Sequence, residues 1–210
     1  LYLMIYRFCF FCFFTLLAIG LPTAAYAATI SVTTADDSVA TDGLCSLREA
    51  IDNANYNQPL HTDCTAGVPL PAMDTIVFSA LGSPTIRLTN GELPVIVDAL
   101  TVQGPATLDG LNQHRIISID GWCGTPTALV PVIMNQMKLA NGKAHNGAAI
   151  YAYDTVSLTV NDSQFTNNEA LVDFSDARGG AIYVRDNVKL NVIGSSFAGN
   201  RAHEGGAISV

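Results

Sequence analysis

The sequence predicts an all-β protein built as a single-stranded parallel β-helix, a solenoid of stacked turns, with one short helix near its start. Two observations carry this prediction. Landmark residues of the C-terminal half recur after 26 or 32 residues, and the segments between them alternate apolar and polar residues at the period of a strand. Charged residues are only 13% of the chain, against ~25% in an ordinary soluble domain, and this composition suits a β-rich secreted protein.

Three segments, 135–150, 162–182 and 194–208, align with one another. Each has an apolar residue near its start and an isoleucine at its end: Leu139 and Ile150, Phe165 and Ile182, and Phe197 and Ile208. The starts recur after 26 and 32 residues and the ends after 32 and 26, as one repeat with one surface insertion at 171–178 would produce. About 26 residues per repeat fits three short strands per turn, and stacked neighbours would supply the core.

Equivalent residues of successive turns are expected to stack. Phe165 and Phe197 would form an interior column with Leu139, and the three isoleucines would form a second one. Asn168 and Asn200 each follow a phenylalanine by three residues and are expected to form an asparagine ladder. Two glycine pairs are expected where the backbone turns sharply or approaches its neighbour closely: Gly179 and Gly180, and Gly205 and Gly206.

Upstream of these repeats the pattern is less regular but still strand-like. Six short segments are expected as further strands: 74–78, 85–88, 93–97, 99–104, 106–110 and 115–120. We therefore divide the chain into a leader at 1–27, an N-terminal cap region at 28–73 and the turns at 74–210. A solenoid needs a terminal capping unit, so the ending "GGAISV" predicts a chain truncated at its C-terminus that continues into a further region.

The first 27 residues have the pattern of a secretory signal peptide. Arg7 is followed by an apolar run at 8–21, and Ala25 and Ala27 form an A-x-A cleavage site, so the cut is predicted after Ala27. The run is shorter than the ~20 residues of a membrane span, and no later stretch is apolar enough to span. We expect a secreted protein or one displayed on a bacterial cell surface or outer membrane.

Cys45, Cys64 and Cys123 follow the leader and would meet an oxidising compartment. Three single bridges are possible, and the shortest loop favours Cys45–Cys64, which would constrain the unfolded chain by about 3 kcal/mol. The cysteines lack the C-x-x-C spacing that is typical of a metal site.

The segment "CSLREAIDNAN" departs from the strand pattern. Leu47, Ala50, Ile51 and Ala54 form one apolar helical stripe. Ser46 with Glu49 predicts a capping box, so the helix should begin at Leu47. We interpret this helix as a cap that covers the open end of the core and its unpaired strand edge. Arg48 and Glu49 are expected to be solvated or capping.

Two motifs carry a family resemblance. The "GGAI" and "FxxN" elements are similar to the repeats of the chlamydial polymorphic outer-membrane proteins, and "DGLCSLREAIDNAN" (42–55) with "DTIVF" (74–78) resembles the CSLREA domain of bacterial exported β-helix proteins. The resemblance covers nearly all of the chain after the leader. It implies a right-handed parallel β-helix in a large exported or surface-displayed protein, often suspected of adhesion, and it brings no activity with it.

Candidate binding residues are few. Asp173, Asp176 and Arg178 lie on the insertion, where solenoids tend to carry function, and Trp122 lies in a Gly-rich loop where it could stack on a sugar. No catalytic residue and no metal ligand are assigned. Ca²⁺ is a minor possibility at the acidic turn 34–43, which holds Asp36, Asp37 and Asp42, although a solvated turn is favoured because the spacing is not that of a calcium loop. His145 and His203 are expected as exposed turn residues.

The sequence favours a non-enzymatic adhesin-like or structural passenger that contacts glycans or cell surfaces. The net charge of −8 disfavours nucleic acid as a partner, and no cofactor is expected. The alternative is a polysaccharide lyase or hydrolase whose active site lies beyond this fragment. A stripe of acidic and basic residues stacked on adjacent turns would favour the enzyme, and the repeats are expected to lack one.

Overall fold

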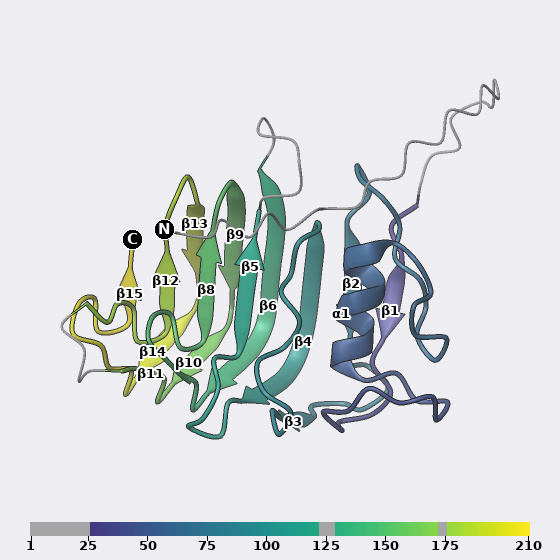
Figure 1. The fold of residues 1–210 in the computed structure, drawn as a ribbon, viewed down its shortest axis with the longest axis horizontal. Coiled ribbons are helices and arrows are strands. Elements are labelled where there is room, and N and C mark those ends of the chain that lie inside the picture. Colours follow the sequence, from purple (N-terminus) through teal and green to yellow (C-terminus); the bar gives the residue numbers. More distant parts are fainter. Residues whose placement is uncertain (1–25, 122–128, 172–175) are drawn as a thin grey trace, which may run out of the picture.

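The structure, a computed structural model, describes residues 26–121, 129–171 and 176–210 (Figure 1). These residues contain one α-helix and short strands, and every strand pair is parallel. The elements in chain order are β1 (Thr29–Ser31), α1 (Leu47–Tyr56), β2 (Asp74–Val77), β3 (Thr85–Arg87), β4 (Leu100–Asp109), β5 (Ile117–Asp120), β6 (Val130–Ala140), β7 (Lys143–Ala144), β8 (Ile150–Tyr153), β9 (Val156–Asn161), β10 (Gln164–Thr166), β11 (Glu169–Ala170), β12 (Ile182–Val184), β13 (Lys189–Ile193), β14 (Ser196–Ala198) and β15 (Ile208–Ser209). The described residues are thus mostly strands in parallel sheets with one short helix, which is consistent with the predicted class.

The strands lie in rows that gain one strand per repeat. The first row has the order β1-β2-β4-β6-β9-β13, and the second row has the order β3-β4-β6-β10-β14. The two rows belong to one sheet because the long strands β4 and β6 run through both. A separate four-stranded sheet, which we call the third sheet, has the order β5-β8-β12-β15. The short strands β7 and β11 pair with each other and lie in the chain between the second row and the third sheet. Figure 1 shows the strands of each row following one another along the long axis of the molecule.

A backbone bend separates the first row from the second in the turns that contain β4, β6, β9 and β13. Gln136 (φ 54°), Asp162 (φ 48°) and Gly194 (φ 59°) occupy the left-handed region at this bend, where Gly and the short polar residues are favoured. One turn earlier Gly104 lies at the same bend, and a Cβ on it would be 2.2 Å from the carbonyl oxygen of Gln136. The bend lets two short apolar segments of each turn face the same interior.

The interior is filled by columns of like side chains, one residue per turn. Phe165 pairs in register with Leu139 and Phe197, and the two phenylalanine rings stack with centroids 4.8 Å apart and planes 6° apart. Three of these columns are Ile30–Ile76–Val102–Met134–Val160–Val192, Ile86–Leu108–Leu139–Phe165–Phe197 and Ile117–Ile150–Ile182–Ile208. Such columns bury apolar surface continuously along the stack.

The asparagine ladder is also a clamp between turns. Asn168 Nδ2 donates to Asn200 Oδ1 at 3.0 Å, which is the expected ladder bond. Each amide also reaches back to the preceding turn: Asn168 Nδ2 donates to the Leu139 carbonyl at 3.1 Å, and Asn200 Nδ2 donates to that of Phe165 at 3.0 Å. Asn168 Oδ1 accepts from the Gly142 amide, and Asn168 itself is fully buried. The amides therefore satisfy backbone groups where the strands of the second row end.

The two glycine pairs differ in the space around them. Gly179 (φ 57°) and Gly205 (φ 59°) take the left-handed conformation. A Cβ on Gly180 would lie 2.2 Å from the Gly206 carbonyl oxygen and 2.5 Å from that of Arg201, whereas a Cβ on Gly206 would meet no atom within 4 Å. Gly180 is thus required for close stacking of the turns, while Gly206 has open space.

The helix packs on the end of the stack beside β1 and β2 (Figure 1). Ser46 and Glu49 form both bonds of a capping box, so α1 begins at Leu47. The buried stripe of α1 joins the core cluster: Leu47, Ala50, Ile51 and Ala54. The first strand, β1, lies within the cap region yet pairs with β2, so the first row begins before residue 74.

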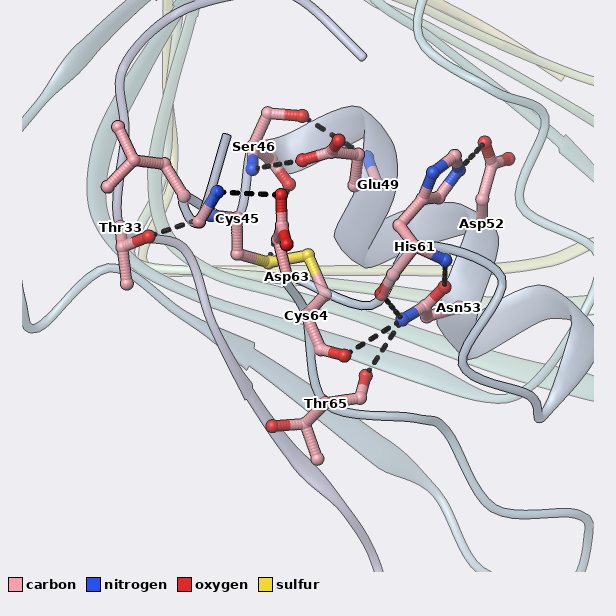
Figure 2. Close-up of a disulfide and its surroundings, with 12 residues drawn as sticks. Thr33, Cys45, Ser46, Glu49, Asp52, Asn53, His61, Asp63, Cys64 and Thr65 are labelled. Atoms are coloured by element: carbon pink, nitrogen blue, oxygen red, sulfur yellow. Dashed lines mark hydrogen bonds and ion pairs between the residues drawn. A yellow bond between two sulfur atoms is a disulfide. The ribbon is translucent and has the colours of Figure 1, made fainter. Parts of the chain in front are cut away.

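A disulfide fixes the loop that follows the helix (Figure 2). Cys45 and Cys64 are bonded across a separation of 19 residues, with a Cα–Cα distance of 4.9 Å. The fully buried Asn53 holds the same loop, because its Nδ2 donates to the carbonyls of His61, Cys64 and Thr65 at 2.9–3.2 Å.

The expectation that Arg48 is solvated or capping is wrong. Its side chain is only 10% exposed and pairs with the buried Asp37, with Nε 2.6 Å from Oδ1 and Nη2 3.0 Å from Oδ2. Arg48 also donates to the carbonyls of Gly91 and Glu92, and Asp37 accepts from the Asn90 amide. The interpretation of 34–43 as a solvated turn therefore fails at Asp37, because this carboxylate is the counter-ion that a buried guanidinium requires.

The expected strand at 93–97 is also wrong, since only Ile96 makes an isolated bridge with Ile119. Pro94 has no N–H to donate to a ladder. Backbone groups here are instead held by α1, since Asn55 binds the Val95 carbonyl and the Val97 amide at 2.7 and 3.0 Å.

The segments 99–104 and 106–110, expected as two strands, are the single strand β4.

The glycine pairs offer a matched test of close stacking. We expect Gly180→Ala to lower the free energy of unfolding by about 1–3 kcal/mol, because its Cβ would push two backbone carbonyls apart. Gly206→Ala is the control and should change stability by less than about 0.5 kcal/mol. Urea denaturation of both variants followed by circular dichroism measures the difference, and equal losses for the two would contradict the stacking described here.

Candidate functional site

The outer surface of the third sheet gathers aromatic and charged side chains. The isoleucines of β8, β12 and β15 point inward, so the next residue of each strand points outward. We call this surface the tyrosine face and define it by six residues: Ser118, Asp120, Tyr151, Tyr153, Tyr183 and Arg185. The register places Ser118, Tyr151, Tyr183 and Ser209 side by side on successive turns.

The rings of the tyrosine face are stacked and flanked by cations. Tyr151 and Tyr183 are parallel, with centroids 5.6 Å apart and planes 1° apart, and Tyr153 lies 4.9 Å from Tyr151. The Arg115 guanidinium lies 5.0 Å from the Tyr151 centroid, and that of Arg185 lies 5.7 Å from Tyr151 and 5.6 Å from Tyr153. Cation–π contacts of this kind hold the rings and guanidinium groups in fixed positions.

A second outward column runs beside the rings. Asp120 pairs in register with Tyr153, and the Arg185 amide donates to the Ala152 carbonyl at 3.1 Å, which places Arg185 on the next turn. The column is thus acidic, aromatic and basic in succession. Asp120 and Arg185 are two turns apart in this column, with Tyr153 between them, so the column does not stack an acid on a base in adjacent turns.

The electrostatics of this column raise the pKa of two groups. Burial and the Asp120 carboxylate, to which its hydroxyl is hydrogen-bonded, raise the pKa of Tyr153 to about 12. Burial, followed by the charges of Asp120 and Asp186, raises the pKa of the Asp154 carboxyl, while Arg185 opposes that shift. Three carboxylates of successive turns therefore share one corner with one guanidinium.

The tyrosine face is connected to the cap through one glutamate. Glu92 accepts from the Ser118 hydroxyl and from Arg115 Nη1 at 3.3 Å. The backbone carbonyl of the same residue accepts from Arg48 Nη1 at 2.7 Å. The buried Arg48 of the helix and the partly buried Arg115 beside the tyrosine face thus hold the same glutamate between them.

The residues proposed from the sequence are only partly brought together. Asp176 pairs with His145 at 2.9 Å, and this contact holds the pKa of Asp176 below its usual value. Arg178 pairs with Glu204 at 2.9 Å and is hydrogen-bonded to Tyr183, so it borders the tyrosine face. Both side chains already have partners within the fold. Three residues of the sequence analysis lie outside the described ranges: Trp122, Cys123 and Asp173.

Sequence reasoning missed the tyrosine face itself. The signal was present, because Tyr151 and Tyr183 each follow the A-I dipeptide of a repeat. The two tyrosines are the outward neighbours of the inward isoleucines that define the repeat.

The described ranges contain no group of three or more His, Cys, Asp or Glu residues placed to hold a metal ion. At the acidic turn, Asp37 is bonded to Arg48. In the same ranges no helix has the length and apolar character of a transmembrane segment.

One known family matches part of this fold. The model of the Chlamydia polymorphic membrane protein repeat matches residues 162–185, which contain β10, β11 and β12. This segment is shorter than one turn, because it lacks a first-row strand. It contains members of an interior column, the clamp and the tyrosine face: Phe165, Asn168 and Tyr183. No curated protein and no solved structure matches the chain.

The raised pKa of Tyr153 gives a spectroscopic test. Its folded pKa of about 12 exceeds the unfolded value of about 10, so its stabilising contribution is present below pH 10 and is lost as the pH rises toward 12. Ultraviolet titration of the folded chain should show a tyrosine that ionises near pH 12. Tyr153→Phe should remove that component and Asp120→Asn should move it toward pH 10. A Tyr153 that ionises near pH 10 in the folded chain would contradict the assigned contact.

Proposed function

We propose that this chain is the exported part of a right-handed, single-stranded parallel β-helix protein that is displayed on a bacterial surface and acts as a non-enzymatic adhesin. The observation that carries the proposal is the match of residues 162–185, which contain β10, β11 and β12, to the Chlamydia polymorphic membrane protein repeat. The parallel rows support the helical path, since crossover connections between parallel strands are nearly always right-handed. The leader pattern at 1–27 and the resemblance of 42–55 to the CSLREA domain support export.

The tyrosine face is the surface through which adhesion would occur, and glycans are the proposed ligands. Its half-buried phenol rings offer apolar surface with polar edges, and Asp120 and Arg185 offer hydrogen bonds of both kinds beside them. The groups are held rigidly by stacking and cation–π contacts, so binding would cost little side-chain entropy.

A glycan array tests this proposal with matched variants. Ser118 and Ser209 occupy the positions of Tyr151 and Tyr183 on neighbouring turns, so Tyr151→Ser and Tyr183→Ser should fold. We expect the chain from Ala28 onward to bind a subset of glycans and each variant to weaken that binding at least about tenfold, as loss of an aromatic anchor does. Tyr56→Ser, at an exposed position on α1, is the control. Absence of glycan binding, or binding unaffected by both variants, would overturn the proposal.

The shared corner of Asp120, Asp154 and Asp186 favours a second candidate function, a polysaccharide-active enzyme. A carboxyl with a raised pKa beside other carboxylates and a guanidinium is an arrangement that acid–base catalysis of glycoside cleavage uses. Uronate polymers should then release reducing sugar or unsaturated products with this chain, and Asp154→Asn should abolish that release while Asp162→Asn should not. No release by the wild-type chain would reject this second function.

A further inference from the structure

A buried carboxylate at the start of β2 holds the backbone of Ala28. Asp74 is 2% exposed; its Oδ1 accepts from the Ala28 amide and its Oδ2 from the Val68 amide, both at 3.0 Å. A Cβ on Gly67 would lie 2.5 Å from Oδ2, so the carboxylate is tightly enclosed. No Lys, Arg or His side chain among the described residues forms an ion pair with Asp74.

Among the described residues, no cationic side chain balances the charge of the buried Asp74 carboxylate. Burial raises the pKa of Asp74 and the nearby charge of Asp98 adds to that shift, while the two amide hydrogen bonds oppose it. A buried carboxylate is most favourable when a cation pairs with it. The amide nitrogen that already contacts Oδ1 belongs to the residue that follows the predicted cleavage site.

The chain leaves the fold immediately before that nitrogen. Tyr26 is 87% exposed and Ala27 is also exposed, whereas Ala28 is half-buried and Thr29 begins β1. The Ala28 carbonyl accepts from the Thr75 amide at 2.9 Å, the first bond between β1 and β2. Because Tyr26 and Ala27 are exposed, removal of the residues up to Ala27 would cost few packing contacts. The nitrogen of Ala28 would remain next to Asp74.

We propose that Asp74 is the receptor for the α-ammonium group that proteolytic processing after Ala27 creates on Ala28. An exported endopeptidase that recognises small residues would hydrolyse the Ala27–Ala28 amide with water. Ala27 leaves as a carboxylate, and the new amine of Ala28 takes up a proton to become an ammonium group. The neutral amide contact with Asp74 Oδ1 is thereby replaced by a buried ion pair. This inference rests on the export proposed above.

The ion pair would act on the first row of the stack. Hydrogen bonds between charged groups are stronger than those of neutral amides, and an ammonium group also offsets the charge of Asp98. Strand β1 is three residues long and pairs with β2 alone, so its attachment depends strongly on each added contact. Processing would then stabilise the pairing of β1 with β2 beside the capping helix. In the chain that retains the leader, this pairing would be less stable.

Two versions of the chain test the proposal directly. One begins at Ala28 after removal of an N-terminal fusion, and the other retains Tyr26 and Ala27 ahead of it; each is made with Asp74 and with Asp74→Asn. We expect the folding equilibrium constant, from urea denaturation, to be about fivefold or more larger for the chain that begins at Ala28. Asp74→Asn should remove this difference between the two versions. An equal stability of the two versions with Asp74 present would overturn the proposal.

A second measurement does not depend on the folding of the Asp74→Asn variant. Reductive ¹³C-methylation of the α-amino group reports its pKa by nuclear magnetic resonance in the folded chain and in urea. The ion pair predicts a folded pKa above the usual ~7.7–8.0 and an ordinary value in urea. A folded pKa at or below the ordinary value would overturn the ion pair.

The N-terminal sequence of the exported protein separates this inference from the proposed function. Ala28 as the first residue supports both. Export with cleavage at another bond would overturn the Asp74 proposal and leave the adhesin proposal standing. Retention of the full leader in the cytoplasm would overturn the export on which both rest.

Discussion

In-register pairing of parallel strands one turn apart is the constraint on which the rest of the molecule depends. Side chains of a strand alternate between the two faces, so a slip of one residue would turn every interior column outward. Asn168 and Gly180 lie on either side of the insertion and fix the register before and after it. The extra residues at 171–178 therefore lengthen one turn without shifting the strands that follow.

The same register explains why aromatic and charged side chains gather on one surface. A column that stacks Ile150 on Ile182 inside also stacks Tyr151 on Tyr183 outside, because the two residues are neighbours on one strand. The repetition that fills the interior thus also places rings and charges in an outer row on the same strands. At the other end, helix α1 and the buried pair of Arg48 with Asp37 close the stack that the repeats leave open.

Features that depend on local pattern could be predicted from the sequence. The capping box at Ser46 needs only four residues, and the register of Phe165 with Phe197 follows from the repeat. Features that depend on distant partners could not. The strand pattern at 93–97 gave no sign that α1 side chains would take its backbone groups, and nothing local to Arg48 indicated that Asp37 would bury it. The tyrosine face was missed because outward positions of a strand need not be apolar, so no hydrophobic pattern in the sequence marks them.

The register itself can be measured by a disulfide between turns. Gln164 and Ser196 are exposed in-register partners on β10 and β14, and adjacent strands lie close enough for a disulfide. In a Cys123→Ser background, Gln164→Cys with Ser196→Cys should cross-link on mild oxidation, as mass spectrometry of the digest would show. Gln164→Cys with Ala198→Cys, two residues out of register, should not. Cross-linking of the second pair in preference to the first would contradict the stacked register.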